Sequence, residues 1–329
     1  MLTYATIGTS WITKAYIDGA ALAGGWQHAA IYSRTQESGE AFAAQTSCPT
    51  VYTDLAALAK SSVDAVYIGS PNMLHYAHSK QMLRAGKHVI CEKPITVTPE
   101  EYAELSALAK QKGVIYCEAI MMMHNPARHI LADAIEKIGI IRSVRFDFSQ
   151  YSSKAYALLH GELPNIFNPA MATGCLMDLG VYCVYPALYF WGKPKNVTAI
   201  ATLLENGSDA GGGAFFDYGD KLVNLTYSKL GQDRLGSQIF GYEGTITIGS
   251  LSQLTDIKLY DMQGSATLLH GETSREQLMA NEARGFYDFI TAPGEHAAHY
   301  RQCDALALAT SELMQQMRSQ AGIRFPING

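Results

Sequence analysis

The sequence lacks the features of several protein classes. Lysine and arginine number 25 against 30 aspartate and glutamate residues, so the net charge is -5 and no basic cluster suits a nucleic-acid backbone. The six cysteines are scattered without a C-x-x-C pair, which argues against a disulfide framework and a zinc site. We therefore expect no nucleic-acid partner and no bound metal.

The sequence also shows no membrane-spanning or secretion signal. No apolar run approaches the ~20 residues that cross a bilayer. The start, MLTYATIG, has no basic stretch ahead of an apolar core, as a secretory signal has. These absences predict a cytoplasmic protein without a membrane partner.

The first third of the chain alternates between strands and helices. Short apolar runs such as YATIG, DAVYIGS and HVICE are separated by segments with helical spacing of apolar residues. One of these, TPEEYAELSALAKQKG, has Thr98 at the N-cap, Pro99 in the first turn and Gly113 at its end. The alternation predicts a doubly wound parallel sheet, which binds ligands beyond the carboxyl ends of its strands.

The alternation of predicted strands and helices ends near residue 120. A helix from Pro126 precedes a series of strand-like runs, and the turn pairs Gly219-Asp220 and Glu243-Gly244 indicate hairpins. The stretch ENGSDAGGG is typical of a flexible loop, and two helices are expected to close the chain. Because 329 residues are many for one core, we predict two domains. They are a dinucleotide-binding α/β domain over 1–120, and over 121–329 an α+β domain with a large, open, mostly antiparallel sheet.

A candidate phosphate turn follows the first strand. The stretch IGTSWIT places Gly8 after the strand, and Thr9, Ser10, Trp11 and Ile12 lead into a helix. A dinucleotide fold brings the helix N-terminus toward an anion at this point. The usual pattern, G-x-G-x-x-G, is reduced here to Gly8, so an ordinary strand–helix turn is equally compatible with these residues.

Polar residues follow two further strands. Ser33 and Arg34 stand where an NAD site needs an acidic residue, and an arginine there can pair with a 2′-phosphate, which favours NADP over NAD. The third long strand ends in GSPNMLH, and its residues that would face the cofactor are Ser70, Pro71, Asn72 and His75. Arg34 is equally typical of a solvated surface, and a lone histidine at a helix start more often has no chemical role.

Two stretches carry titratable groups that could act on a substrate. Lys93 follows a buried strand, beside Glu92 and ahead of Pro94, and a partly desolvated lysine next to a carboxylate can exchange protons. Asp178 and Tyr182 lie four residues apart in an expected helix, so the carboxylate could orient the phenol. Taken alone, these stretches are more typical of a solvated lysine and a core tyrosine.

In this order, the residues resemble the glucose–fructose oxidoreductase / inositol dehydrogenase / rhizopine-catabolism (Gfo/Idh/MocA) family. The resemblance covers essentially the whole chain and rests on the turn at Gly8, SPNMLH, CEKPIT, the EA…P stretch from Glu118 to Pro126, and GCLMDLGVY. It implies an N-terminal Rossmann domain, a C-terminal domain with an open antiparallel sheet, and a cis peptide before Pro94. It also implies NAD(P)-dependent oxidation of a sugar or polyol, and a homodimer or homotetramer formed through the C-terminal sheet.

The resemblance implies roles for the site residues as well. Lys93 would lie by the nicotinamide, Tyr182 would exchange the hydroxyl proton, and Asp178 would orient Tyr182 or bind a substrate hydroxyl. Many relatives carry histidine at position 182, and a tyrosine there is similar to the branch with dimeric dihydrodiol dehydrogenase and xylose dehydrogenases, which favour NADP.

Two departures from the family pattern keep other functions open. Trp11 replaces a small residue in the glycine turn, and Met123 stands where an arginine is often found. The alternatives are a non-catalytic dinucleotide-binding sensor and a lyase-like or glycosidase variant that holds NAD, against which Arg34 speaks. Substrate-pocket side chains are expected from the second domain, among them Tyr151, Tyr156, Phe167 and Asn168.

Overall fold

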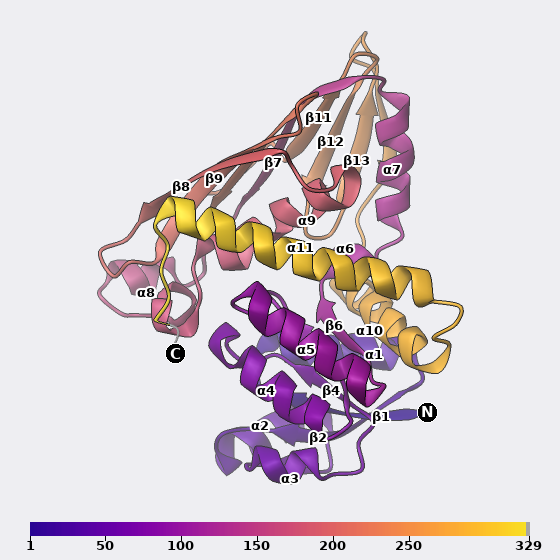
Figure 1. Cartoon of the computed structure of the whole chain (residues 1–329), viewed down its shortest axis with the longest axis vertical. Coiled ribbons are helices and arrows are strands. Elements are labelled where there is room, and N and C mark those ends of the chain that lie inside the picture. The colour runs from indigo at the N-terminus through magenta and orange to yellow at the C-terminus, as the bar shows by residue number, and fades with distance from the viewer. Residues whose placement is uncertain (327–329) are drawn as a thin grey trace. The chain divides into compact units, whose positions relative to one another are not determined.

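The chain forms two compact units, seen in the computed structural model of residues 1–326 (Figure 1). The first unit consists of Met1–His124 together with Ser274–Leu308. The second consists of Asn125–Thr273 together with the chain from Ala309 onward. The first unit therefore takes in a segment from near the end of the sequence.

The first unit contains a six-stranded parallel sheet in the order β3-β2-β1-β4-β5-β6. Its strands are β1 (Leu2–Ile7), β2 (Trp26–Tyr32), β3 (Val51–Tyr52), β4 (Ala65–Ile68), β5 (His88–Glu92) and β6 (Tyr116–Ala119). Its helices include α1 (Trp11–Ala23), α2 (Gln36–Thr46), α3 (Leu55–Ala59), α4 (Asn72–Arg84), α5 (Pro99–Lys112), α6 (Met121–His124) and α10 (Arg275–Thr291). The predicted doubly wound parallel sheet is confirmed.

Helix α5 begins and ends where the sequence predicts. The Thr98 hydroxyl accepts from the Glu101 N–H over 3.3 Å, and the Glu101 carboxylate accepts in turn from the Thr98 N–H. This capping box satisfies two N–H groups that the first helical turn leaves without partners. Gly113 ends the helix in the left-handed conformation, with φ 68°.

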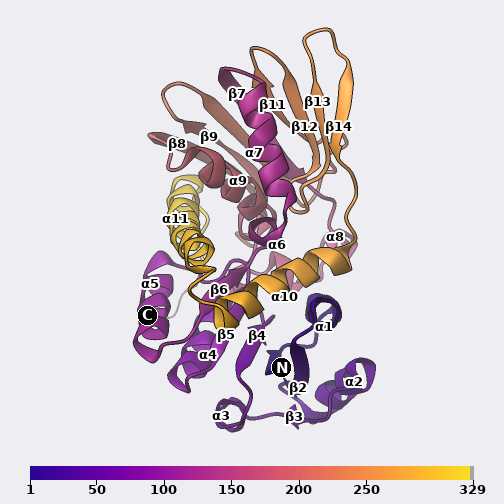
Figure 2. The ribbon, with the colours of Figure 1, turned by 90° about the vertical axis from the view of Figure 1, so that its right-hand side faces the viewer.

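Helix α10 closes the first unit against α1, as Figure 2 shows. The two helices approach so closely that a Cβ at Gly19 would overlap Met279. Leu278 and Met279 also pack against Met121 of α6. A segment distant in sequence thus completes the core around the first strands.

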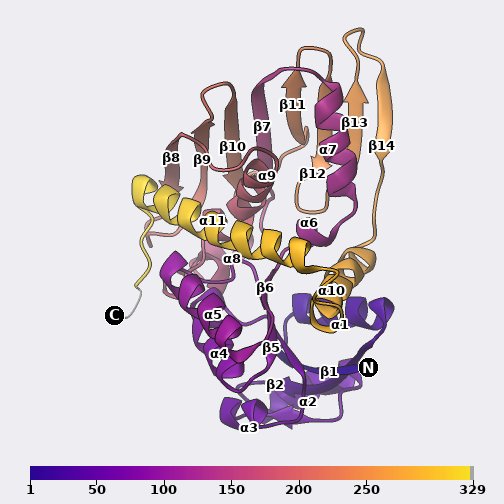
Figure 3. The ribbon, with the colours of Figure 1, turned by 45° about the vertical axis from the view of Figure 1, so that its right-hand side comes forward.

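The second unit contains an eight-stranded sheet in the order β14-β13-β12-β11-β7-β10-β9-β8 (Figure 3). Its strands are β7 (Ile141–Ser149), β8 (Asn196–Leu203), β9 (Asp209–Asp217), β10 (Leu222–Ser228), β11 (Ser237–Gly241), β12 (Thr245–Ser250), β13 (Thr255–Tyr260) and β14 (Ala266–His270). Among the strand pairs between residues 141 and 270, only β7–β10 is parallel, so the prediction of a mostly antiparallel sheet is confirmed. The two predicted hairpin turns connect β9 to β10 and β11 to β12.

Helices pack on one face of this sheet. The contacts are made by α7 (Ala127–Lys137) with β13 and β14, and by α9 (Val181–Trp191) with β7 and β10. The short helix α8 (Ala155–Leu159) follows β7, and the long helix α11 (Ala297–Ala321) runs from the first unit into the second.

The predicted flexible loop ENGSDAGGG is wrong for its second half, because β9 begins at Asp209. Gly212 and Gly213 lie between the backbones of the neighbouring strands. A Cβ at Gly212 would stand 2.6 Å from the Ile200 carbonyl oxygen, and one at Gly213 would stand 2.7 Å from that of Leu225. The glycines allow close pairing here, where the composition indicated flexibility.

One helical stretch of the described chain, Pro169–Trp191, is long and apolar enough to cross a membrane. The expectation that no apolar run approaches this length is therefore wrong. In the structure this stretch is part of the protein core, because 83% of its apolar window is buried. Buried helices of globular proteins pass the same test of length and composition.

Candidate active site

The turn after β1 has the backbone shape of a phosphate-binding turn. Gly8 has φ +110°, a conformation that residues with a side chain rarely adopt. A Cβ at this position would stand 2.7 Å from the Gly69 carbonyl oxygen at the end of β4. The turn therefore needs glycine here, and the space above the first turn of α1 suits the close approach of a dinucleotide phosphate.

The residues after Gly8 divide between solvent and core. Thr9 and Trp11 are exposed, and the Trp11 indole is 67% exposed with the Arg275 guanidinium 5.1 Å above its ring. Ile12 packs its side chain against the cluster of Met121, Leu278 and Met279. The half-buried Ile12 side chain thus contacts the core, whereas Trp11 presents an exposed side chain at the helix start, with Arg275 beside it.

Ser33 and Arg34 lie at the carboxyl end of β2. Ser33 is buried and its N–H donates to the Tyr52 carbonyl oxygen over 3.0 Å. Arg34 is exposed and directly precedes Thr35, the N-cap of α2. The guanidinium therefore lies at the same edge of the sheet as Gly8, where the ribose of a dinucleotide is bound in this fold.

His75 joins two of the predicted site segments. It is buried in α4, with Nε2 at 2.7 Å from the Ser70 carbonyl oxygen and Nδ1 at 2.9 Å from that of Pro94. Burial lowers the pKa of His75, and the charge of Lys93 lowers it further. Ser70, Pro71 and Asn72 are half-buried at the end of β4, so His75 fixes their loop to the Lys93-Pro94 turn.

Lys93 lies at the carboxyl end of β5 in a dense set of hydrogen bonds. The expected cis peptide between Lys93 and Pro94 is confirmed. Glu92 accepts from the Tyr67 hydroxyl over 2.6 Å and from the Lys93 N–H over 3.3 Å, and Glu118 accepts from the Ile95 N–H over 2.8 Å. The half-buried Lys93 is thereby held at the strand edge that also carries Gly8 and Ser70.

A third carboxyl group, Glu282 of α10, was missed by sequence reasoning. It is 1% exposed, and neither carboxylate oxygen has a hydrogen-bond partner within residues 1–326. Burial raises the pKa of Glu282 well above its ordinary value, and the charges of Glu92 and Glu118 raise it further. Its position in a helix about 190 residues beyond Lys93 gave no signal in the sequence.

In the second unit, Asp178 lies in a π-helical turn, Leu176–Gly180, directly before α9. The expectation of a regular helix with Asp178 and Tyr182 one α-turn apart is wrong, because the wider turn changes their spacing. Such single π turns are frequent at functional sites. Tyr182, in the first turn of α9, is half-buried with its ring 5.1 Å from that of Phe148.

Asp178 has a strong partner that sequence reasoning also missed. The Lys229 ammonium donates to Asp178 Oδ2 and is buried directly after β10. Asp209, at the start of β9, is buried as well and accepts from the Leu176 N–H over 2.6 Å. The sequence signal for Lys229 was the same as for Lys93, namely a lysine at the carboxyl end of an apolar strand.

The other expected substrate residues divide into exposed and structural ones. Tyr151 and Tyr156 are exposed, and the Tyr156 ring stacks on His160. Phe167 is buried, and the Lys229 Nζ lies 5.7 Å from its ring centre. The Asn168 amide oxygen accepts from the Ala170 N–H, so it caps a short 3₁₀ turn.

Met123, the second departure from the family pattern, is part of the core. It is buried in α6, and its carbonyl oxygen lies 2.8 Å from His299 Nε2. His124 beside it is buried next to Gly285, where a Cβ would overlap the histidine ring. The place of the missing arginine is thus filled by a packed turn of the first unit.

Family models match most of the chain. Residues 2–119 match the oxidoreductase family with an NAD-binding Rossmann fold, and residues 127–247 match the GFO/IDH/MocA C-terminal domain. The chain belongs to the Gfo/Idh/MocA oxidoreductase family. It is accordingly an NAD(P)-dependent enzyme, and the turn at Gly8 lies within the matched NAD-binding domain.

Individual relatives match this chain over almost its whole length. The chain is 37% identical to an uncharacterized oxidoreductase, YgjR, of Escherichia coli, over 99% of this chain and 98% of that protein. It is 33% identical to scyllo-inositol 2-dehydrogenase (NADP(+)) IolU of Bacillus subtilis, over 99% of each. The fold is shared with KijD10, a 3-ketoreductase from Actinomadura kijaniata in complex with NADP and TDP-benzene, at a TM-score of 0.86 and 23% identity over 97% and 98% of the two chains.

Proposed function

We propose that this oxidoreductase transfers a hydride between NADP and a hydroxyl or carbonyl group of a sugar, polyol or cyclic diol. The observation that carries the proposal is the placement of Lys93 at the sheet edge that also bears Gly8, Ser33 and Ser70. The Bacillus subtilis relative is named for the same cofactor and for an inositol substrate, which supports the substrate class. In this proposal the first unit binds the dinucleotide and the second binds the substrate.

Each of the three reacting side chains has a role that its chemistry suits. The Lys93 ammonium stabilises the oxyanion that develops on the substrate, and Tyr182 takes the hydroxyl proton in oxidation or returns it in reduction. Asp178 binds a substrate hydroxyl. Bound NADP supplies or accepts the hydride.

The choice of NADP rests on Arg34. An exposed guanidinium at the end of β2 can pair with a 2′-phosphate, and no acidic residue stands at positions 33 or 34 to hold a free ribose hydroxyl. Ser33 is too buried to replace the arginine as the main contact. In this proposal NAD is the weaker of the two cofactors.

The test is to assay Lys93→Met and Tyr182→Phe for NADPH-dependent turnover on a panel of sugars and polyols. Removal of the acid–base group is expected to lower kcat about 10²- to 10⁴-fold, and removal of the ammonium about 10²- to 10³-fold. Lys60→Met and Tyr242→Phe, both exposed, serve as matched controls. Unchanged rates in the first pair would remove both residues from the mechanism.

A different result of the same assay would favour a dinucleotide-binding sensor. Wild-type protein that binds NADPH, seen by cofactor fluorescence, but turns over no member of the panel has the properties of that alternative. The exposed Trp11 is the departure that speaks for it.

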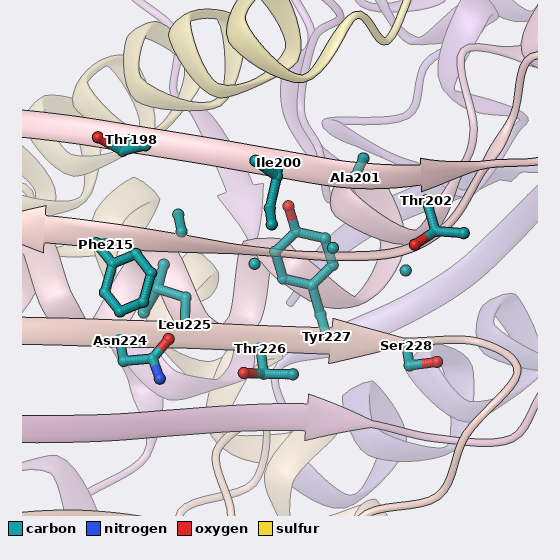
Figure 4. Close-up of a pocket in the computed structure, with 14 residues that line it drawn as sticks. Thr198, Ile200, Ala201, Thr202, Phe215, Asn224, Leu225, Thr226, Tyr227 and Ser228 are labelled. Atoms are coloured by element: carbon teal, nitrogen blue, oxygen red, sulfur yellow. The ribbon is translucent and has the colours of Figure 1, made fainter.

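We further propose that the open face of the second unit's sheet joins copies of this chain into a homodimer or homotetramer. Gly211 and Gly213 of β9 leave a groove of ≈ 510 Å³ between β8 and β10 (Figure 4). The exposed side chains of Ile200 and Phe215 border it. Exposed apolar side chains beside a depression on one sheet face support an interface between copies of the chain.

Sedimentation of Phe215→Glu tests this interface. The variant is expected to sediment as a monomer at concentrations where the wild type is a dimer or tetramer. Leu22→Glu, an exposed apolar residue of α1, is the control. A wild type that is monomeric at all concentrations contradicts the proposal.

A cytoplasmic location is also proposed. All six cysteines are free and buried, as in proteins of reducing compartments. Cell fractionation with an antibody to the protein checks this location.

A further inference from the structure

Lys229 is a buried lysine fixed at the π-helical turn that carries Asp178. The Lys229 N–H donates to the Ala210 carbonyl oxygen over 2.9 Å, and the Lys229 carbonyl accepts from the Ser152 N–H over 2.9 Å. Its main chain is thus held between β9 and the segment that follows β7. An ammonium on such a backbone reaches Asp178 from a defined direction.

The Lys229–Asp178 pair is buried unevenly. The Lys229 side chain is 1% exposed and the Asp178 side chain 29%. The Phe167 ring, 5.7 Å from Nζ, covers the ammonium with apolar surface. A ligand that enters from solvent therefore meets the carboxylate, with the ammonium behind it.

Asp209 holds the beginning of the same turn. Its Oδ2 accepts from the Leu176 N–H over 2.6 Å, and a Cβ at Gly174 would overlap its Oδ1. Burial raises the pKa of Asp209, and the charge of Lys229 opposes that rise. The backbone before Asp178 and the side chain of Asp178 are thus fixed by separate partners.

We propose that Lys229 is a positioning residue that holds Asp178 as an ionised acceptor for a substrate hydroxyl adjacent to the one that reacts. This inference rests on the proposed function. An ionised carboxylate accepts hydrogen bonds and donates none, so it selects a neutral donor such as the neighbouring hydroxyl of a vicinal diol. A substrate with hydrogen or a carboxylate at that position loses this bond or is repelled.

Titratable groups from several elements lie on or beside the π turn that carries Asp178. Lys229 follows β10, Asp209 begins β9, Cys175 precedes the π turn, and Tyr182 lies on α9. Burial raises the pKa of Cys175, so the thiol stays neutral. Lys229 supplies the positive charge in this set, and its removal is expected to raise the pKa of Asp178.

The test compares wild type, Lys229→Met and a matched control, Lys258→Met. Lys258 forms a half-exposed pair with Asp256 in the same unit. The first readout is the titration of the Asp178 carboxyl by ¹³C NMR, assigned with Asp178→Asn. We expect an upward shift of this titration in Lys229→Met and none in Lys258→Met.

The second readout is kcat/KM for a vicinal diol substrate and for its analogue without the neighbouring hydroxyl. In Lys229→Met, kcat/KM for the diol is expected to fall about 10- to 100-fold, which corresponds to the loss of a hydrogen bond to a charged group. The value of kcat/KM for the analogue is expected to change little. This selective loss separates positioning from a general structural effect, which would affect both substrates.

A second variant covers the case in which Lys229→Met does not fold. Lys229→Met with Asp178→Asn removes both charges, which proteins tolerate better than one uncompensated charge. This double variant is expected to lose no more activity than Asp178→Asn alone. Additive losses, or an unchanged Asp178 titration in Lys229→Met, would overturn the inference. A wild type without turnover would count against the proposed function alone, because the NMR readout does not need turnover.

Discussion

Replacing Glu282 by glutamine is expected to change how the stability of the protein depends on pH. Glu282 is buried in α10 without a hydrogen-bond partner for its carboxylate among residues 1–326. Burial, then the charges of Glu92 and Glu118, raise its pKa well above the ordinary 4.5. The folded chain therefore keeps a proton that the unfolded chain releases above pH 4.5.

The sign and size of the effect follow from this proton. An acid whose pKa is raised by folding loses stability as the pH rises, until the pH passes its folded pKa. One proton corresponds to a slope of about 1.4 kcal/mol per pH unit. While the folded carboxyl stays protonated, its cost in unfolding free energy grows as the pH rises above 4.5, relative to a group that cannot ionise.

The assay is urea unfolding at several pH values from 5 to 8, followed by far-UV circular dichroism. The difference in unfolding free energy between Glu282→Gln and wild type is expected to grow as the pH rises, by at most about 1.4 kcal/mol for each pH unit. Glu276→Gln, exposed in the first turn of the same helix, is the control and is expected to show no such growth. Parallel curves for wild type and Glu282→Gln would refute the reasoning.

Three further outcomes are expected. Gly8→Ala is expected to destabilise the protein by about 1–3 kcal/mol and to weaken NADPH binding, because φ +110° and the nearby Gly69 carbonyl both oppose a Cβ. Gly86→Ala, where φ is +77° but the space around a Cβ is open, is the control. In the same urea assay it measures the cost of the backbone conformation alone. Thr98→Ala lowers the unfolding free energy by about 1 kcal/mol through loss of the capping box, and a midpoint unchanged in thermal unfolding would contradict this. Arg34→Ser weakens NADP more than NAD in fluorescence titrations, and equal losses for both cofactors would remove Arg34 from the 2′-phosphate site.

Local patterns predicted much of the fold. The alternation of apolar strands and helical segments gave the parallel sheet, and the capping signals of α5 act over three residues. The hairpin turns were equally visible, because their residues determine the turn by themselves. These features depend on neighbours in sequence.

Features that depend on distant partners were not predictable. The strand character of Gly212 comes from the backbones of β8 and β10, and composition favoured a loop. The π turn at Asp178 interrupts a run whose residues are compatible with a plain helix. Lys229 and Glu282 became visible only when folding brought them beside Asp178 and Glu92.

The return of α10 to the first unit bears on how the protein is made. The Trp26 indole N–H donates to the Ala283 carbonyl oxygen, a partner 257 residues further along, and its ring stacks on Phe286. When only the first 120 residues have left the ribosome, this tryptophan therefore lacks the partners that α10 supplies. A truncated clone that ends there is expected to aggregate, and fragments meant for binding studies should carry α10 fused behind residues 1–124.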